Sequence, residues 1–293
     1  MIHAEGIRLN ILCFNIRCFM DIKLIAVDMD GTLLDDHSKV SEENLKAIRR
    51  LSKKGISVVP VTGRTYHEIP AEVRDEECVK YFVFSNGSGI YEKGKGIMYS
   101  STIERDTAVG IYALLTSYET FIEIYSGGYP WADKNKVNKE SFDYYKINPR
   151  FQQVIMEKRK RAEDFGAMLK NESLKPELFD AFFRDMSDRA ECLERIHDRY
   201  PEIEIVSSMG NNLEIMNKST NKGTGLKRLC EMLSLDIGRT LALGDSKNDM
   251  DMFKAAGICY AVSNACGEIK AAANGIICSN NDNVIQYVEG NIL

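Results

Sequence analysis

The strongest constraint on the fold is an alternation of short apolar runs with amphipathic segments. KLIAV (23–27) is a continuous apolar run, which is typical of a strand buried on both faces. A helix pattern follows from the expected N-cap Ser41 to Gly55, and two further strands are expected in ISVVPVTGR (56–64) and YFVFSNGSG (81–89). Strand, helix and strand at this spacing predict a parallel, doubly wound α/β sheet.

The C-terminal part repeats this order. GTGLKRLCEMLSL (223–235) has a helical pattern, TLALGDS (240–246) is a strand running into an acidic loop, and NDMDMFKAAG (248–257) is a second helix. CYAVSNA (259–265) and GIICS (275–279) are expected to be short strands. In open α/β sheets, ligands bind at the carboxyl ends of the strands, so the polar residues after these strands are the candidates for a functional site.

The middle of the chain has a different pattern, which predicts an inserted α+β module. FIEIYSGGYPWADK (121–134) predicts a hairpin around Gly127 and Gly128, and EIEIVSS (202–208) predicts a strand. The charged run EKRKRAED (157–164) has opposite charges at i,i+4, which is typical of a solvated helix face. We expect residues 102–208 to form this module, inserted into a core of residues 20–101 and 209–293.

Composition and charge exclude several classes of function. A formal net charge of −5 argues against a nucleic-acid or anionic-membrane partner, and no apolar run is long enough for a transmembrane helix. The eight cysteines are scattered without a C-x-x-C pair, as expected of free thiols in a cytoplasmic protein. Residues 1–19 lack the features of a signal peptide and are expected to be an extension outside the fold. The oligomeric state stays open.

Four motifs combine residues that can carry out chemistry. They are Asp28-x-Asp30-Gly-Thr, Thr62-Gly63-Arg64, Lys222-Gly223 and Gly244-Asp245-x-x-Asn248-Asp249. Each motif alone is weak evidence, because such short patterns arise by chance. All four, however, follow a predicted strand or begin a predicted helix, and together they predict one site.

The charges of these motifs favour a phosphoryl-transfer site that uses Mg²⁺. Two carboxylates about 4 Å apart repel by ~4 kcal/mol at an effective dielectric near 20, and a phosphate adds further negative charge. A hard divalent cation with oxygen ligands offsets that repulsion, and few carboxylates favour Mg²⁺ over Ca²⁺. Lys222 supplies a point charge for phosphate and Thr62 a hydroxyl donor. Of the two aspartates in the first motif, one can attack phosphorus while the other moves protons.

The four motifs resemble those of the haloacid dehalogenase superfamily, and most closely its Cof-type, subfamily IIB members. The resemblance implies that Asp28 is the nucleophile and Asp30 the general acid/base. It implies that Thr62 and Lys222 bind the phosphoryl group, with Gly63 and Arg64 beside them. It also implies that Asp245 binds Mg²⁺ with the Asp28 carboxylate and the Asp30 backbone carbonyl, and that Asn248 and Asp249 support metal and substrate.

The spacing of the motifs is similar to that of members with a type-2 cap. Asp28 and Thr62 are 34 positions apart, whereas Thr62 and Lys222 are 160 apart, so the insertion follows the second motif. The resemblance implies that this cap closes over the site and reads the leaving group. Three points stay open: Arg64 binds phosphate or an acidic side chain, Asn86-Gly87 contacts substrate or forms a turn, and Lys218 is a rival to Lys222.

These observations predict a Mg²⁺-dependent phosphatase that acts on a small phosphorylated metabolite such as a sugar phosphate. A phosphomutase or phosphotransferase of the same superfamily shares the chemistry and stays open. A dehalogenase would not need Asp30. A non-enzymatic phosphate-binding regulatory module, such as a receiver domain, lacks both the second aspartate and the cap.

Overall fold

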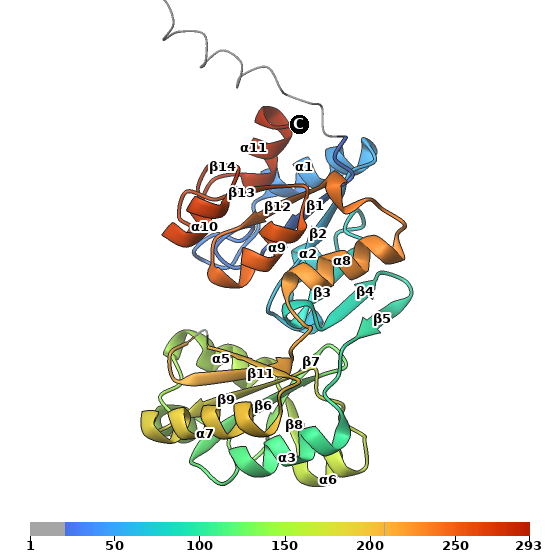
Figure 1. Ribbon diagram of the computed structural model, residues 1–293. Coiled ribbons are helices and arrows are strands. Elements are labelled where there is room, and N and C mark those ends of the chain that lie inside the picture. Colours follow the sequence, from blue (N-terminus) through green and yellow to red (C-terminus); the bar gives the residue numbers. More distant parts are fainter. Residues whose placement is uncertain (1–20, 208) are drawn as a thin grey trace, which may run out of the picture.

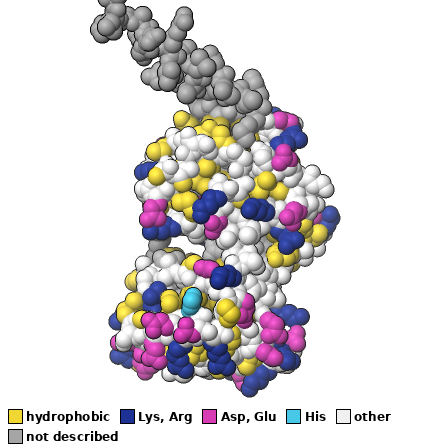
Figure 2. Space-filling model, in the orientation of Figure 1, with side chains coloured by type: hydrophobic (Ala, Val, Ile, Leu, Met, Phe, Trp, Pro, Cys, Tyr) yellow, Lys and Arg dark blue, Asp and Glu magenta, His cyan; other side chains and the backbone are white. Residues whose placement is uncertain are grey.

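The computed structural model describes residues 21–207 and 209–293, so the predicted extension at residues 1–19 lies outside the described part of the chain. The chain forms a core lobe and a cap lobe joined by two linkers (Figure 1). In the space-filling view, the lobes meet across a constriction, and basic and acidic side chains are interspersed over both (Figure 2). Among the described helices, none is long and apolar enough to cross a bilayer.

The core lobe is built on a five-stranded parallel sheet with the order β14-β13-β12-β1-β2. All four residues of β1 and all five of β12 are buried, as the apolar runs predict for strands covered on both faces. Helices α1 and α11 pack on each other, as do α8 and α9. The elements of the core lobe are β1 Leu24–Val27, α1 Glu42–Lys53, β2 Ser57–Pro60, η1 Tyr66–Glu68, α2 Ala71–Arg74, β3 Tyr81–Phe84, η2 Ser85–Gly87, β4 Gly89–Glu92, β5 Gly96–Ser100, α8 Lys222–Met232, η3 Ile237–Arg239, β12 Thr240–Gly244, η4 Lys247–Asp249, α9 Met250–Ala255, β13 Ile258–Ala261, α10 Gly267–Ala272, β14 Gly275–Ile276 and α11 Val284–Asn291.

The strand predicted at residues 81–89 is interrupted. It ends at Phe84, and the single turn η2 separates it from β4. Strands β3, β4 and β5 form a small antiparallel sheet, which a parallel bridge between Val61 and Val83 joins to the end of β2. The chain reverses at η2 because Asn86 adopts the left-handed conformation, with φ 52° and ψ 32°.

The cap lobe contains a six-stranded sheet with the order β10-β11-β9-β6-β7-β8, antiparallel except for the pair β7 and β8. One face packs on α3, α6 and α7, and part of the other face packs on α4 and α5. Its elements are α3 Arg105–Leu115, β6 Thr120–Ser126, β7 Tyr129–Asp133, α4 Lys139–Tyr144, α5 Pro149–Lys158, β8 Lys160–Ala162, α6 Phe165–Lys170, β9 Leu178–Phe183, α7 Met186–Arg199, β10 Ile203–Val206 and β11 Asn212–Asn217.

Two expectations for the middle of the chain are wrong. The predicted boundary after residue 208 is too early, because β11 pairs with β9 and β10 and so extends the cap sheet to Asn217. The run 157–164 is not one helix: α5 ends at Lys158, and β8 pairs with β7. Pairing with β7 outweighs the local charge pattern, which favoured a helix face.

The two linkers between the lobes are bonded to each other. The side-chain amide of Asn217 donates to Ser101 Oγ at 3.1 Å and to the carbonyl oxygen of Thr102 at 2.9 Å. The hydroxyl of Thr220 lies 3.1 Å from that of Ser101. The chain therefore leaves the core lobe and returns to it at adjacent points.

Candidate active site

The predicted site residues lie in loops that follow three neighbouring strands. Strand β1 pairs with β12 on one side and with β2 on the other, so Val27 lies beside both Leu243 and Pro60. The loop with Asp28 and Asp30 follows β1, the Thr62-Gly63-Arg64 segment follows β2, and Asp245 follows β12. Parallel pairing thus brings three of the four motifs to one edge of the sheet, as expected for an open α/β sheet.

Lys222 brings the fourth motif into this group from the first turn of α8. Its Nζ donates to Asp28 Oδ1 at 2.6 Å and to Asp249 Oδ1 at 2.7 Å, and all three side chains are buried. Burial opposes the charged amine, but Asp249 and Asp28 outweigh that effect and raise the pKa of Lys222 above its usual value. Its rival Lys218 is exposed and its Nζ lies 3.5 Å from the carbonyl oxygen of Pro201, so Lys222 is the lysine within the site.

Asp249 holds the end of β12 in place. Its Oδ2 accepts hydrogen bonds from the backbone N–H groups of Asp245, at 2.9 Å, and Ser246, at 3.0 Å. A Cβ on Gly244 would lie only 2.6 Å from the carboxyl carbon of Asp249, so this packing requires glycine. One carboxylate therefore fixes the backbone after β12 with one oxygen and Lys222 with the other.

Three carboxylates converge closely enough to hold a metal ion. One oxygen from each of Asp28, Asp245 and Asp249 lies within 4.8 Å of the others. Burial raises the pKa of Asp28 well above its usual range, and the charges of Asp249 and Asp245 add to that effect against the opposing charge of Lys222. Burial and Asp249 likewise raise the pKa of Asp245, although Thr32 Oγ1 donates to Asp245 Oδ1 at 3.1 Å. One lysine binds only two of these three carboxylates, so an oxygen-ligated divalent cation fits both the donor set and the charge deficit.

Asp30 is separate from this cluster and binds Arg64. Arg64 Nε donates to Asp30 Oδ2 at 2.7 Å, and Nη2 donates to Oδ1 at 2.6 Å. The side chain of Asp30 is 53% exposed, while that of Arg64 is 25% exposed. Of the two partners expected for Arg64, phosphate or an acidic side chain, the structure shows the acidic side chain of Asp30. A role for the Asp30 backbone carbonyl as a metal ligand stays a prediction.

Thr62 and Asn248 flank the site from two sides. Thr62 is buried, and its Oγ1 accepts a hydrogen bond from the backbone N–H of Arg64 at 3.1 Å. The side-chain amide of Asn248 lies 3.5 Å from Asn86 Oδ1, and a Cβ on Gly63 would lie 3.1 Å from the same oxygen. The Asn86-Gly87 pair forms a turn, and Asn86 Nδ2 also donates to Glu214 Oε2 of the cap lobe at 3.2 Å.

Arg159 forms a contact between the lobes that the sequence did not reveal. It follows α5 in the cap lobe, and its side chain is only 7% exposed. Its Nε and Nη2 donate to the two carboxylate oxygens of Glu123 on β6, at 2.6 and 2.9 Å, and Nη1 binds Glu68 of η1 in the core lobe. No local signal marks Arg159, because its two partners lie far away in the sequence.

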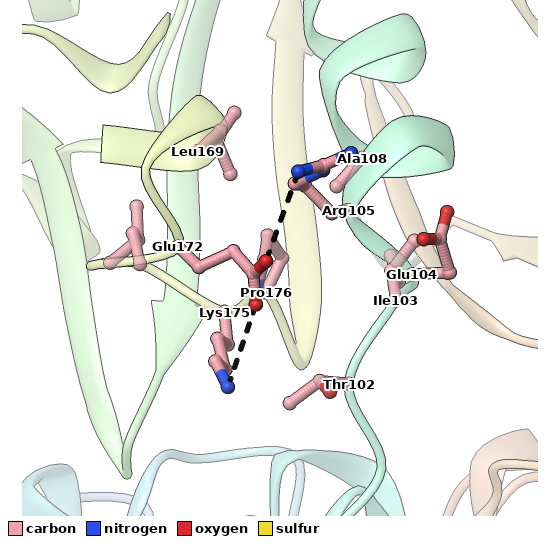
Figure 3. A pocket seen from close by; sticks show the side chains of 10 residues that line it. Thr102, Ile103, Glu104, Arg105, Ala108, Leu169, Glu172, Lys175 and Pro176 are labelled. Atoms are coloured by element: carbon pink, nitrogen blue, oxygen red, sulfur yellow. Dashed lines mark ion pairs between the residues drawn. The ribbon is translucent and has the colours of Figure 1, made fainter. Parts of the chain in front are cut away.

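A cavity of ≈ 450 Å³ lies in the cap lobe at the start of α3, away from these residues (Figure 3). Its wall includes Arg105 and Lys175, both facing Glu172, with ion-pair distances of 4.0 and 3.7 Å. None of the predicted site residues lines it. The chemistry of the four motifs is therefore centred at the carboxyl edge of the core sheet.

Comparisons of the sequence and of the fold with known proteins all point to the same family. The model of the haloacid dehalogenase-like hydrolases matches residues 25–288. The chain belongs to this family. Phosphatase YwpJ of Bacillus subtilis is 26% identical over 93% of this chain and 100% of its own length. The 5-amino-6-(5-phospho-D-ribitylamino)uracil phosphatase YcsE of the same organism is 28% identical over 89% of this chain and 92% of its own.

A solved haloacid dehalogenase-like hydrolase from B. subtilis has the same fold. Its TM-score is 0.78 at 26% identity, and the match covers 93% of this chain and 100% of that one. The α/β core with a cap and the resemblance to Cof-type members are thus confirmed, as is the prediction of a hydrolytic enzyme. The roles of individual residues, the metal and the substrate stay predictions.

Proposed function

We propose that this protein is a Mg²⁺-dependent phosphatase that hydrolyses a small phosphorylated metabolite through an aspartyl phosphate on Asp28. The observation that carries the proposal is the buried Asp28 carboxylate, which shares Lys222 with Asp249 while Asp30 lies two residues further along the chain. One carboxylate is held inside the site for attack, and the other lies at its exposed rim. This division suits a nucleophile and a proton carrier.

In the first step, an oxygen of Asp28 attacks phosphorus, and the bond from phosphorus to the leaving oxygen breaks. Asp30, in its protonated form, gives its proton to that leaving oxygen. In the second step, Asp30 takes a proton from water as the water attacks phosphorus. The bond to Asp28 breaks, inorganic phosphate leaves, and both aspartates return to their starting states.

The surrounding residues position these groups. Lys222 keeps the Asp28 carboxylate oriented and would oppose the charge of a bound phosphoryl group, and Thr62, two residues after β2, would donate a hydrogen bond to that group. Asp28 and Asp245 would hold Mg²⁺, while Asp249 supports the backbone of Asp245 and Asn248 lies at the rim. A bound Mg²⁺ neutralises charge on the phosphoryl oxygens and on the clustered carboxylates.

A sugar or sugar-alcohol phosphate is the substrate class that we propose. YcsE, which is 28% identical to this protein, is named as a phosphatase of 5-amino-6-(5-phospho-D-ribitylamino)uracil, whose phosphate is carried by a ribityl chain. Glu214 of the cap lobe contacts Asn86 beside the site, so we expect the cap lobe to contact the leaving group. A phosphotransferase would share the first step, but it would return the phosphoryl group to an acceptor other than water.

Kinetics on a substrate panel test the proposal. Purified protein should release phosphate from p-nitrophenyl phosphate and from several sugar phosphates with Mg²⁺, and chelation should stop the reaction. Asp28→Asn should abolish turnover, whereas Asp251→Asn, a change of an acid on the outer part of α9, should not. Wild-type turnover by Asp28→Asn would disprove the mechanism. Transfer of phosphate to added sugar instead of water would favour the phosphotransferase.

A further inference from the structure

The contact between Arg159 and Glu68 is one of several side-chain contacts between the two lobes, which include Asn86 with Glu214 and His67 with Tyr129. Arg159 uses three nitrogens to bind two carboxylates, one from each lobe. All three side chains are at most 10% exposed. A buried arginine between two carboxylates is costly to assemble unless every partner is in place.

The two carboxylates that Arg159 binds belong to different lobes. Glu123 and Arg159 both belong to that lobe, so they can stay paired wherever the lobe sits. Glu68 belongs to the core lobe, so its bond to Arg159 exists only when the lobes meet. The backbone N–H of His67 also donates to the carbonyl oxygen of Gly128 in the cap lobe, at 3.2 Å. The cap lobe therefore contacts the turn at residues 65–68 directly, through both a side chain and the backbone.

This same turn holds Arg64, which binds Asp30. The backbone carbonyl oxygen of Glu68 accepts a hydrogen bond from Arg64 Nη1 at 3.1 Å. The Glu68 side chain accepts two more from Thr65, from its N–H at 3.2 Å and its hydroxyl at 2.9 Å. Arg64 in turn binds both oxygens of Asp30. An unbroken set of bonds thus runs from the cap lobe to the proposed proton carrier.

We propose that Arg159 and Glu68 are positioning residues, which couple closure of the cap lobe to the placement of Asp30 through Arg64. The proposal rests on the proposed function, because it assigns proton transfer to Asp30. When the lobes separate, Glu68 loses its cap partner, the turn at residues 65–68 loosens, and Arg64 no longer holds Asp30 in one orientation. When the lobes close, the turn is fixed from both sides, and Asp30 is ordered only when the cap covers the substrate.

Glu68→Gln tests this coupling with little change in shape. The glutamine keeps an oxygen for Thr65 but loses the charge that binds Arg159, while Arg159 and Glu123 stay paired within the cap lobe. Arg159→Lys is a second variant, because a single ammonium group cannot replace the three guanidinium nitrogens that bind both oxygens of Glu123 and one of Glu68. Glu76→Gln is the matched control: Glu76 binds Arg49 at 2.7 and 3.0 Å in the core lobe, and neither residue contacts Arg159 or Asp30 in the described structure.

The first measurement needs no substrate. Amide hydrogen exchange of the full chain should show that residues 65–69, including the His67 N–H, exchange about tenfold faster in Glu68→Gln and Arg159→Lys. The Glu76→Gln control should leave this segment unchanged. Exchange at the wild-type rate in both variants would overturn the proposal, whether or not a substrate has been found.

The second measurement separates positioning of Asp30 from a general loss of structure. A p-nitrophenyl leaving group needs little proton donation, whereas the alkyl oxygen of glycerol 2-phosphate needs a proton from Asp30. Glu68→Gln should therefore lower kcat/KM for glycerol 2-phosphate about tenfold more than for p-nitrophenyl phosphate, in the same direction as Asp30→Asn. Equal losses on both substrates would overturn the proposal.

The two hypotheses fail in different ways. If Asp30→Asn lowers kcat/KM for glycerol 2-phosphate more than for p-nitrophenyl phosphate while Glu68→Gln lowers both equally, the coupling is wrong and the proposed function stands. If Asp28→Asn retains full activity, the proposed function is wrong, and with it the role assigned to Asp30.

Discussion

Lys222 Nζ lies 2.6 Å from Asp28 Oδ1, and both side chains are buried at the centre of the site. The lysine is placed by the first turn of α8, where Asn221 caps the helix and accepts a hydrogen bond from the Thr224 N–H at 2.8 Å. A Cβ on Gly223 would lie 2.2 Å from the carbonyl oxygen of Asp251, so glycine lets α8 approach α9 this closely. Lys222 therefore supplies the charge, and Gly223 allows the close helix packing that places Lys222 in the site.

Replacing this lysine should impair both stability and activity. Lys222→Met leaves the carboxylates of Asp28 and Asp249 buried without their cation, and breaking such a pair costs about 3–5 kcal/mol. Denaturant unfolding without metal should show this loss, and kcat/KM for an aryl phosphate should fall at least about a hundredfold. Lys227→Met on the exposed side of α8 is the control and should change neither quantity.

Asp28, the proposed nucleophile, should show a trade-off between activity and stability. The folded state raises the pKa of Asp28 above its unfolded value of 3.8. As the pH rises from 3.8 to the higher pKa of the folded state, ionisation of Asp28 therefore lowers the free energy of unfolding. At pH 7, the free energy of unfolding of metal-free Asp28→Asn should therefore equal that of the wild type or exceed it by up to about 2 kcal/mol. The gain should disappear below pH 3.8, where the wild-type carboxyl is protonated in both states. A less stable variant at pH 7 would contradict this expectation.

Mg²⁺ should stabilise the protein by binding at Asp28 and Asp245. Free Mg²⁺ at about 100 times its Kd should add about 2.7 kcal/mol to the free energy of unfolding, and thermal denaturation should show a matching rise in Tm. A chelator should reverse it. Asp245→Asn should lose most of the Mg²⁺-dependent rise, whereas Asp251→Asn should keep it. An equal rise in both variants would place the binding site elsewhere.

Gly87 and Gly94 allow a test of backbone packing beside the site. Both have positive φ, 95° and 84°, so alanine is strained at either position. Around Gly94 there is open space, whereas a Cβ on Gly87 would lie 2.2 Å from the carbonyl oxygen of Asn221. Gly94→Ala should cost about 1 kcal/mol, and Gly87→Ala should cost at least about 2 kcal/mol more, because backbone has to move. Thermal unfolding of the two variants measures the difference.

The contact of His67 with the cap lobe should weaken in mild acid. The His67 ring stacks on Tyr129 at 3.5 Å between centroids, and burial with the charges of Arg74 and Lys160 lowers the pKa of His67 to about 4. A folded pKa below the unfolded value of 6.5 means that stability is lost as the pH falls from 6.5 to about 4. The loss should not exceed about 2 kcal/mol, because solvent screens a half-buried ring.

Unfolding between pH 7 and pH 4 measures this effect. His67→Phe keeps an aromatic ring against Tyr129 and should remove part of the pH dependence. The control His197→Gln changes a side chain that is 78% exposed and should leave the pH dependence as it is in the wild type. Identical pH profiles of wild type and His67→Phe would show that His67 does not contribute.

The sequence was enough to predict the centre of the site because strand ends are local features. Asp28, Thr62 and Asp245 each follow a strong apolar run, and parallel pairing places such ends together. The same reasoning could not decide between phosphate and an acid for Arg64. That choice depends on the side-chain direction of Asp30, which no local pattern encodes.

The cap lobe was harder to predict because its decisive contacts are distant in the sequence. The run around Arg159 has helix-like charge spacing, yet β7 draws it into a strand, and Arg159 binds Glu68, which is 91 positions away. The boundary at residue 208 was misplaced because β11 is one strand among several alternating segments. Only its pairing with β9 assigns it to the cap sheet.

The paired linkers have an evolutionary consequence. Asn217 binds Ser101 and Thr102, so the whole cap lobe begins and ends at almost the same point of the core. A segment with adjacent ends can be replaced by another of different length or shape without rerouting the strands that carry the aspartates. Recombination at this junction would exchange one cap lobe for another while keeping the core sheet and its aspartates, and a designed chimera could use the same two crossover points.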